Sequence, residues 1–283
     1  MINALTIDVE EYFQVSAFES VIKTDDWEHF ESRVEKNTLH ILDILDTYHT
    51  KATFFVLAWI AERQPQLVRE IAARGHEVGS HGYTHRRVYT QDTCQFQRET
   101  RMSKHMLEDI TGHPILGYRA ASYSITRDSL WALDVLKQEG FVYDSSIYPI
   151  RHDLYGIPGY QRFCHIHITP HGQSLVEFPI STVRIGKTNF PIGGGGYFRL
   201  FPYFVTRWGI SRLNNTERQP AVVYLHPWEI DPSQPRIRAG RKSRFRHYLN
   251  LDRTVPRLSR LLKDFQFGPM VDVLRSQGYR ITT

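Results

Sequence analysis

Short apolar segments alternate with amphipathic segments along this chain of 283 residues, and this alternation restricts its fold more than any other feature. The apolar run at 52–57 (ATFFVL) is rich in β-branched and aromatic residues, which is typical of a buried parallel strand. Residues 33–48 instead place leucine and isoleucine on one helical face. We therefore expect strands at 4–8, 52–57, 76–80, 115–119, 141–144, 175–179 and 221–226, and helices at 33–48, 65–74, 91–110, 127–138, 255–264 and 269–277.

Strands that alternate with helices indicate a parallel sheet with the helices on its outside. About seven parallel strands favour a deformed (β/α) barrel over an open sheet, although periodicity alone does not separate the two. The expected fold class is therefore α/β, in a single domain over residues 1–283. In both architectures ligands bind at the carboxyl ends of the strands.

Six polar residues fall at or just beyond the carboxyl ends of the expected strands. Polar side chains with ordinary structural roles would scatter along the elements instead. Because the carboxyl ends of parallel strands lie together, we expect these six side chains to share one site. They are Asp8, Glu10, His81, Arg119, Asp144 and His226.

Two histidines and a cluster of acids could hold a metal ion. His81 and His85 are four residues apart, a spacing that places both rings on one face of a helical turn. Along a strand Asp8 and Glu10 face the same side, and Glu11 faces the other. Such a set can bind one divalent metal and leave a position for water, which a metal deprotonates near neutral pH. A hydrogen-bonded loop pair and solvated acids are the alternatives.

Two further residues suit catalysis. Arg119 ends the strand expected at 115–119, where a guanidinium could hold a carboxylate in its ionised form. His226 ends the strand expected at 221–226, and an imidazole there could act as a general acid because its pKa lies near neutral pH. His76 is not spaced for the same site, so we expect a structural role for it.

Composition excludes several other classes of protein. The formal net charge is +5, and no nucleic-acid recognition motif accompanies the basic residues, so we expect no nucleic-acid partner. Cys94 and Cys164 match no CxxC pattern and are expected to be free, buried thiols in a reducing compartment. Without a long apolar run or a signal-peptide pattern, we expect a cytoplasmic or membrane-peripheral protein. A solvated or substrate-facing basic loop is expected from Arg236, Arg238, Arg241, Lys242, Arg244 and Arg246.

Taken in order, the motifs resemble those of the polysaccharide deacetylases of carbohydrate esterase family four, also called the NodB type. Within that family the chain is similar to the bacterial subgroup encoded beside exosortase and exopolysaccharide loci. The resemblance covers essentially the whole chain, with a subgroup-specific part at about 190–283. The segments that carry it are TIDVEEYF at 6–13, GHEVGSHGYTH at 75–85, YRAASYS at 118–124, YDSSIYP at 143–149, PIGGGGYFR at 191–199, YLHPWE at 224–229 and FRHYLNL at 245–251.

The resemblance implies a metal-dependent N-deacetylation of N-acetylated hexosamine units in a bacterial exopolysaccharide or its precursor. It implies that a divalent metal, with zinc the expected ion, is held by Glu10, His81 and His85. The family's usual first motif has adjacent aspartates, whereas here Val9 separates Asp8 from Glu10.

The resemblance also implies the catalytic roles. Asp8 would be the general base, Arg119 would orient it, and His226 would be the general acid. The family uses an aspartate to orient its catalytic histidine, and Asp144 is the matching candidate here, with Glu177 as its rival.

Substrate contacts are expected around the same strand ends. A backbone N–H near Ser122 or Tyr123 would help to hold the tetrahedral oxyanion. The glycine run at 193–196 lacks the lysine of a phosphate-binding loop, so we expect it to line the substrate cleft. The remaining expected contacts are Gly194, Gly195, Tyr197 and Trp228.

Two other functions are compatible with these residues. One is a deacylase of small amides or cyclic imides on the same barrel, and the glycine-rich and aromatic segments favour a sugar over such substrates. The other is a catalytically inactive glycan-binding protein. The complete set of base, metal ligands and acid argues against it, because a binding protein needs no such set.

Overall fold

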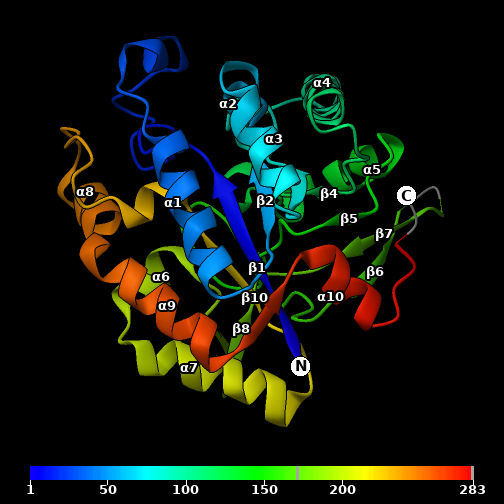
Figure 1. The fold of residues 1–283 in the computed structure, drawn as a ribbon. Coiled ribbons are helices and arrows are strands. Elements are labelled where there is room, and N and C mark those ends of the chain that lie inside the picture. The colour runs from blue at the N-terminus through cyan, green and yellow to red at the C-terminus, as the bar shows by residue number, and fades with distance from the viewer. Residues whose placement is uncertain (170–171, 282–283) are drawn as a thin grey trace.

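A computed structural model describes residues 1–169 and 172–281, and its centre is a nine-stranded sheet (Figure 1). Seven parallel strands follow one another in the order β10-β1-β2-β3-β4-β5-β7. The strand β6 is antiparallel to β7, and β11 pairs with the beginning of β1. The bounds are β1 Ile2–Val9, β2 Thr53–Val56, β3 Glu77–Ser80, β4 Gly117–Tyr118, β5 Tyr143–Asp144, β6 His165–Ile168, β7 Ser174–Glu177, β10 Val222–Leu225 and β11 Gln266–Gly268.

The sheet curls into the deformed (β/α) barrel that the sequence predicts. Among the described residues no strand pairing joins β7 to β10, so loop segments close this side of the barrel. The amide of Val222 donates to the Ser181 hydroxyl at 2.7 Å, and the amide of Tyr224 donates to the Gly193 carbonyl at 2.7 Å. These bonds satisfy the free edge of β10 where a strand would otherwise pair.

Helices surround the barrel, as Figure 1 shows for α1, α3, α9 and α10. The α-helices are α1 Val34–Thr47, α2 Ala58–Arg63, α3 Pro65–Ala73, α4 Thr93–Thr111, α5 Trp131–Gln138, α6 Gly195–Leu200, α7 Tyr203–Arg212, α8 Arg241–Tyr248, α9 Thr254–Asp264 and α10 Met270–Ser276. Shorter helical turns are η1 Thr24–His29, η2 Val88–Thr90, η3 Ala121–Tyr123, η4 Arg127–Ser129, η5 Leu213–Glu217, η6 Pro227–Ile230 and η7 Leu251–Arg253. None of the described helices is long and apolar enough to cross a bilayer.

The expected strands and helices are confirmed, with some bounds shortened. The helix expected at 127–138 divides into the turn η4 and the helix α5. Several elements were not predicted: β6, β11, the helices α2, α6, α7 and α8, and a hairpin of β8 (Thr182–Ile185) and β9 (Thr188–Pro191). Cys94 and Cys164 are free, as expected, but neither is fully buried, since Cys94 is exposed and Cys164 is half-buried.

Successive side chains of β1 point to opposite faces of the strand, and this alternation determines which of them reach the barrel interior. Leu5, Ile7 and Val9 lie in the core cluster that α1 covers, so the alternate positions Thr6 and Asp8 point to the other face. Both are buried, and both accept hydrogen bonds from one arginine inside the barrel.

Glu11 leaves the strand on the opposite side, as the alternation predicts. Its Oε1 accepts bonds from the Ser32 hydroxyl at 2.6 Å and from the backbone amides of Arg33 and Val34 at 2.8 and 3.1 Å. These amides begin α1 and have no partners within the helix. Glu11 therefore fixes the start of α1 and is not available to the site.

Candidate active site

A cavity of about 200 Å³ opens at the carboxyl ends of the barrel strands. It collects side chains from segments far apart in the sequence, as the strand-end argument predicts. Of the six expected residues, Asp144 and Arg119 do not line this cavity, although Arg119 reaches it through its bond to Asp8. The lining residues that the sequence predicts are Asp8, Glu10, His81, His85, Ser122, Tyr123, His226 and Trp228.

Asp8 is bound to Arg119 deep inside the barrel. Arg119 Nη1 donates to Asp8 Oδ1 at 2.7 Å, and both side chains are almost completely buried. The rest of the guanidinium is also engaged, because Nε and Nη2 donate to the carbonyl and hydroxyl of Ser145 at 3.1 and 3.0 Å. Tyr123 Oη lies 3.4 Å from Asp8 Oδ2. Asp8 is therefore held by a fixed cation, which is the arrangement expected for it.

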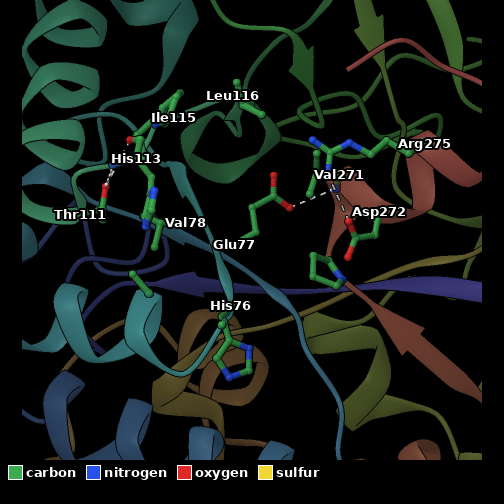
Figure 2. Close-up of a pocket in the computed structure, with 14 residues that line it drawn as sticks. His76, Glu77, Val78, Thr111, His113, Ile115, Leu116, Val271, Asp272 and Arg275 are labelled. Carbon is green, nitrogen blue, oxygen red and sulfur yellow. Dashed lines mark hydrogen bonds and ion pairs between the residues drawn. The ribbon is translucent and has the colours of Figure 1, made fainter. Parts of the chain in front are cut away.

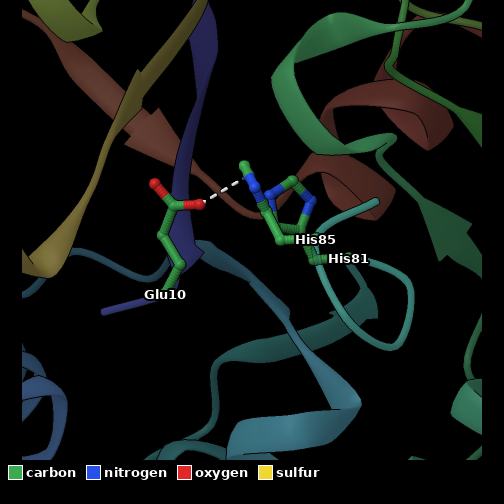
Figure 3. Close-up of side chains that lie close together, drawn as sticks. All are labelled: Glu10, His81 and His85. Atoms are coloured by element: carbon green, nitrogen blue, oxygen red, sulfur yellow. Dashed lines mark ion pairs between the residues drawn. The ribbon is translucent and has the colours of Figure 1, made fainter. Parts of the chain in front are cut away.

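Glu10, His81 and His85 form a compact buried cluster (Figure 3). Each offers one ligand atom, and these three atoms lie within 4.8 Å of one another. His85 Nε2 is 2.7 Å from Glu10 Oε2. Trp228 Nε1 donates to Glu10 Oε1 at 3.1 Å and holds the carboxylate in place. The structure thus brings together the three residues that the sequence names as metal ligands.

The cluster fits a zinc-like ion by its donor chemistry. Two imidazoles and a carboxylate are a common ligand set for catalytic zinc. His81 Nδ1 lies 2.8 Å from the carbonyl oxygen of Arg119, so this nitrogen carries the hydrogen and Nε2 keeps its lone pair. Burial lowers the pKa of His81 to about 4, which keeps the ring neutral. Apart from His85 Nε2 at 2.7 Å, itself a candidate ligand, the buried Glu10 Oε2 has no polar partner, so both atoms could turn to a shared ion.

The two histidines do not sit on a helical turn, which corrects the sequence-based explanation of their spacing. The residues from His81 to Arg87 form an irregular loop. Gly82 and His85 have φ values of 80° and 51°, in the left-handed region that non-glycine residues rarely adopt. These two reversals turn the loop back on itself, so the rings of His81 and His85 meet at a centroid distance of 5.4 Å.

Glu229 is the carboxylate that contacts His226. Its Oε1 meets His226 Nδ1, and its Oε2 accepts from Arg199 Nε at 2.8 Å. The other ring nitrogen, His226 Nε2, faces the cavity and lies 3.9 Å from Asp8 Oδ2 and 3.6 Å from Glu10 Oε1. Burial lowers the pKa of His226, but the charges of Glu10 and Glu229 outweigh burial and raise this pKa to about 9.

The expectation that Asp144 or Glu177 orients His226 is therefore wrong. These two carboxyl groups are partners in the β5–β7 register and face each other. Asp144 also accepts from the Ser146 hydroxyl at 2.6 Å, and Glu177 accepts from the Ile147 amide at 3.2 Å. Burial raises the pKa of both groups, which favours a shared proton between them.

Most of the glycine run at 193–196 packs against β10 behind the site, and Gly196 alone of the four lines the cavity. A Cβ at Gly194 would lie 2.0 Å from the Tyr224 carbonyl oxygen, and a Cβ at Gly195 would lie 2.5 Å from the Tyr224 ring. Only glycine permits this approach to β10. Gly196 reaches the cavity, whereas Gly194, Gly195 and Tyr197 do not, which corrects their expected role as substrate contacts.

Ser122 and Tyr123 do line the cavity, and both have left-handed φ values of 52°. The Tyr123 amide already donates to the Ala120 carbonyl at 3.1 Å. It is therefore engaged, and of the two expected oxyanion donors only the Ser122 amide stays a candidate. Arg246 of the expected basic loop also lines the cavity, and lining residues that the sequence did not predict include His152, Tyr155, Arg199 and His247.

A separate hollow lies at the opposite, amino end of β3 (Figure 2). Its central acid, Glu77, accepts bonds from the Thr53 and Tyr143 hydroxyls and from the Val271 amide. His76 Nδ1 accepts from the Ala52 amide at 3.1 Å, which confirms its structural role. These groups tie α10 and β3 to the barrel, and we assign no chemistry to this hollow.

The deformed parallel barrel thus carries a candidate metal cluster and an arginine-bound aspartate at its carboxyl end. Residues 22–142 match the family described as polysaccharide deacetylase. Residues 145–275 match a domain of unknown function, DUF3473. The segment 22–142 is thus similar to polysaccharide deacetylases.

The curated relatives resemble part of the chain. A chitooligosaccharide deacetylase of Bradyrhizobium is 29% identical over 99 residues, which are 35% of this chain and 43% of the relative. A peptidoglycan-N-acetylglucosamine deacetylase of Bacillus cereus is 33% identical over 76 residues, which are 27% of this chain and 28% of the relative. The chain thus spans less than half of the length of these two relatives.

Solved structures support the fold. A Mycobacterium smegmatis protein assigned as a polysaccharide deacetylase superposes with a TM-score of 0.63 over 99% of this chain and 92% of its own, at 20% identity. The PuuE allantoinase superposes with a TM-score of 0.62 over 96% of this chain and 88% of its own, at 16% identity. At these identities the similarity concerns the fold alone.

Proposed function

We propose that this chain is a metal-dependent N-deacetylase of N-acetylated hexosamine units in a glycan. The observation that carries the proposal is the placement of Glu10, His81 and His85 beside the Arg119-bound Asp8 and His226 in one cavity. The deacetylase relatives support the reaction type, and the subgroup resemblance favours a bacterial exopolysaccharide or its precursor as the glycan.

Glu10, His81 and His85 would hold the metal, with zinc the ion that their donor set favours. When bound, such an ion supplies Lewis-acid polarisation of the acetyl carbonyl and of the attacking water. Trp228 and the carbonyl of Arg119 fix the orientation of Glu10 and His81 through hydrogen bonds. These contacts keep the ligand atoms in place before the substrate arrives.

Asp8 would act as the general base. Its Oδ1 is occupied by Arg119, so Oδ2 is the oxygen that faces the cavity and accepts the proton of the attacking water. The bond to the fixed guanidinium prevents Asp8 from turning toward the metal ligands. The water oxygen adds to the acetyl carbon and forms a tetrahedral adduct.

His226 would act as the general acid. Its Nε2 faces the cavity, and it would give its proton to the nitrogen as the carbon–nitrogen bond breaks. The products are acetate and the free amino sugar. Glu229, held in turn by Arg199, fixes the imidazole so that Nε2 points at the substrate.

The test is acetate release from N-acetylated oligosaccharides by the metal-loaded protein, with and without a chelator. We expect release that stops with the chelator and returns when zinc is added back. Small amides and cyclic imides form a second panel. Turnover of that panel alone would replace the proposal with the small-amide deacylase, and glycan binding without any release would indicate an inactive binding protein.

A further inference from the structure

A basic groove of about 760 Å³ lies beside the β8–β9 hairpin, outside the catalytic cavity. One wall is the hairpin, with Arg184 and Lys187 near its turn. The other wall is the loop after β5, with Arg151 and Arg162. No aspartate or glutamate lines the groove. Four cations therefore face a concave surface that holds no acid of its own.

Three of these four cations have no carboxylate partner among the described residues. Arg162 Nη1 is paired with Glu217 at 2.8 Å and is half-buried. Arg151, Arg184 and Lys187 are exposed, and no ion pair of 4 Å or less involves them within 1–169 and 172–281. A ligand that brings negative charge would therefore meet three cations that are not already neutralised.

Hydrogen bonds hold the two walls together. Asn189 Nδ2 on β9 donates to the Pro149 carbonyl at 2.7 Å. Arg162 Nη2 donates to the Thr182 carbonyl at the start of β8 at 2.6 Å. The hairpin and the loop thus keep a fixed spacing across the groove, so the three free cations lie on a prepared surface.

The groove adjoins the catalytic cavity through one short stretch of chain. Ile150 and Arg151 line the groove, while His152, Leu154 and Tyr155 line the cavity. Asp153 lies within this stretch, but it is paired with Lys242 at 2.9 Å and with Arg246 at 3.6 Å, so it offers no unpaired acid between the groove and the cavity. A polymer with one unit in the cavity would reach the groove with a neighbouring unit.

We propose that this groove binds an anionic group, a carboxylate or a phosphate, on the same glycan whose N-acetyl group enters the cavity. The proposal rests on the proposed function and adds to it the class of substrate: an acidic glycan instead of a neutral one. Planar guanidinium groups suit both anions, because they donate two parallel hydrogen bonds to them.

The experiment measures equilibrium binding to the full chain with tetragalacturonate, inorganic pyrophosphate and neutral chitotetraose as probes. The double variant Arg184→Gln/Lys187→Gln removes two of the free cations. A charge-preserving variant, Arg184→Lys/Lys187→Arg, keeps them. The matched control Lys36→Gln/Arg69→Gln removes the same charge from exposed positions on α1 and α3. Thermal unfolding and metal content check that each variant is folded.

The double glutamine variant should bind the anionic probe about threefold to tenfold more weakly, since exposed ion pairs are individually modest. Binding by the charge-preserving variant and by the control should match the wild type. Preference for tetragalacturonate identifies a carboxylate glycan, and preference for pyrophosphate identifies a phosphate. Equal loss in the control, or anionic probes bound no better than chitotetraose, would overturn the proposal. Tighter binding of single-stranded DNA than of both anions would also overturn it.

Acetate release from chitotetraose separates this proposal from the proposed function. Anion binding without acetate release from any acetylated oligosaccharide would contradict the proposed deacetylase function and support the groove as an anion site. Acetate release without anion binding would contradict the proposed anion site and support the proposed deacetylase.

Discussion

His226 depends on a carboxylate only three residues away, on the turn η6 that follows β10. Replacing Glu229 with glutamine keeps an acceptor for Arg199 but removes the negative charge that holds the imidazole. We expect kcat to fall about 10- to 100-fold with little change in KM, because comparable positioning carboxylates contribute on this scale. Steady-state kinetics on an acetylated oligosaccharide would measure kcat and KM separately.

The matched control is Glu177→Gln. Glu177 is also fully buried, but it faces Asp144 and not His226. Because burial already favours its protonated form, glutamine should replace it with little loss of fold or kcat. Equal losses in the two variants, or a fall only in Glu177→Gln, would mean that Glu229 does not position the acid.

Asp8 should be separable from the metal ligands by mutation. Asp8→Asn should retain bound metal and lose about 10²- to 10⁴-fold in turnover, because it removes the base and leaves the ligand cluster. Elemental analysis beside the kinetics measures both. The variant should also unfold more easily, since it leaves Arg119 buried without its counter-charge. If Asp8→Asn loses the metal and Glu10→Gln keeps it, the two roles are reversed.

At this scale the sequence located most of the candidate site but not all of its contacts. The position of Asp8, Arg119 and His226 at strand ends predicted that they lie at the same end of the barrel, and the structure brings them together. Their chemical roles stay predictions. Glu229 was not predicted because the family resemblance pointed to Asp144, although a carboxylate three residues after a histidine could have indicated the contact.

His76, just before β3, is linked to the residue just before β2, since its Nδ1 accepts a hydrogen bond from the Ala52 amide. Burial lowers the pKa of His76 from 6.5 to about 4. As the pH falls, His76 therefore gains a proton in the unfolded chain before it does so in the folded one. The contribution of neutral His76 to the free energy of unfolding is fully present above pH 6.5 and is lost as the pH falls toward 4. We expect this residue to account for roughly 2–3 kcal/mol of that loss in the free energy of unfolding.

Urea unfolding at several pH values tests this expectation. His76→Gln keeps an acceptor for Ala52 but cannot titrate, so its stability should fall less steeply between pH 6.5 and 4. The exposed His113→Gln should follow the wild type. If the free energy of unfolding of His76→Gln falls as steeply with pH as that of the wild type, other groups cause the loss of stability in acid.

Elements with a clear apolar period were predictable, and the others lacked such a signal. β1, β2 and β10 are buried apolar runs, which makes them distinct in the sequence. The missed β6 is an edge strand with alternating exposed residues. Helix α7 exposes Phe204 and Trp208 to solvent, so its apolar residues do not mark one buried face. The β8–β9 hairpin contributes no strand to the main sheet.

The metal should stabilise the whole molecule, because the three ligands come from the residue after β1 and from the loop after β3 and meet only in the folded state. At a metal concentration about 100 times Kd, binding to the native state alone adds about 2.7 kcal/mol. We therefore expect chelation to lower Tm by several degrees. His81→Ala and His85→Ala should contain much less metal by elemental analysis and should show no such shift. Undiminished metal in both variants would rule out this cluster as the metal site.

The position of β1 has a consequence for how the protein is made. During synthesis β1 leaves the ribosome more than 200 residues before two of its three neighbours, β10 at 222–225 and β11 at 266–268. Until they arrive, β1 has only β2 beside it and exposes an apolar edge that other chains can pair with. A polypeptide that stopped at residue 142, where the deacetylase match ends, would keep that edge open permanently and would lack His226. The two matched segments are therefore expected to be inherited, expressed and degraded as one unit.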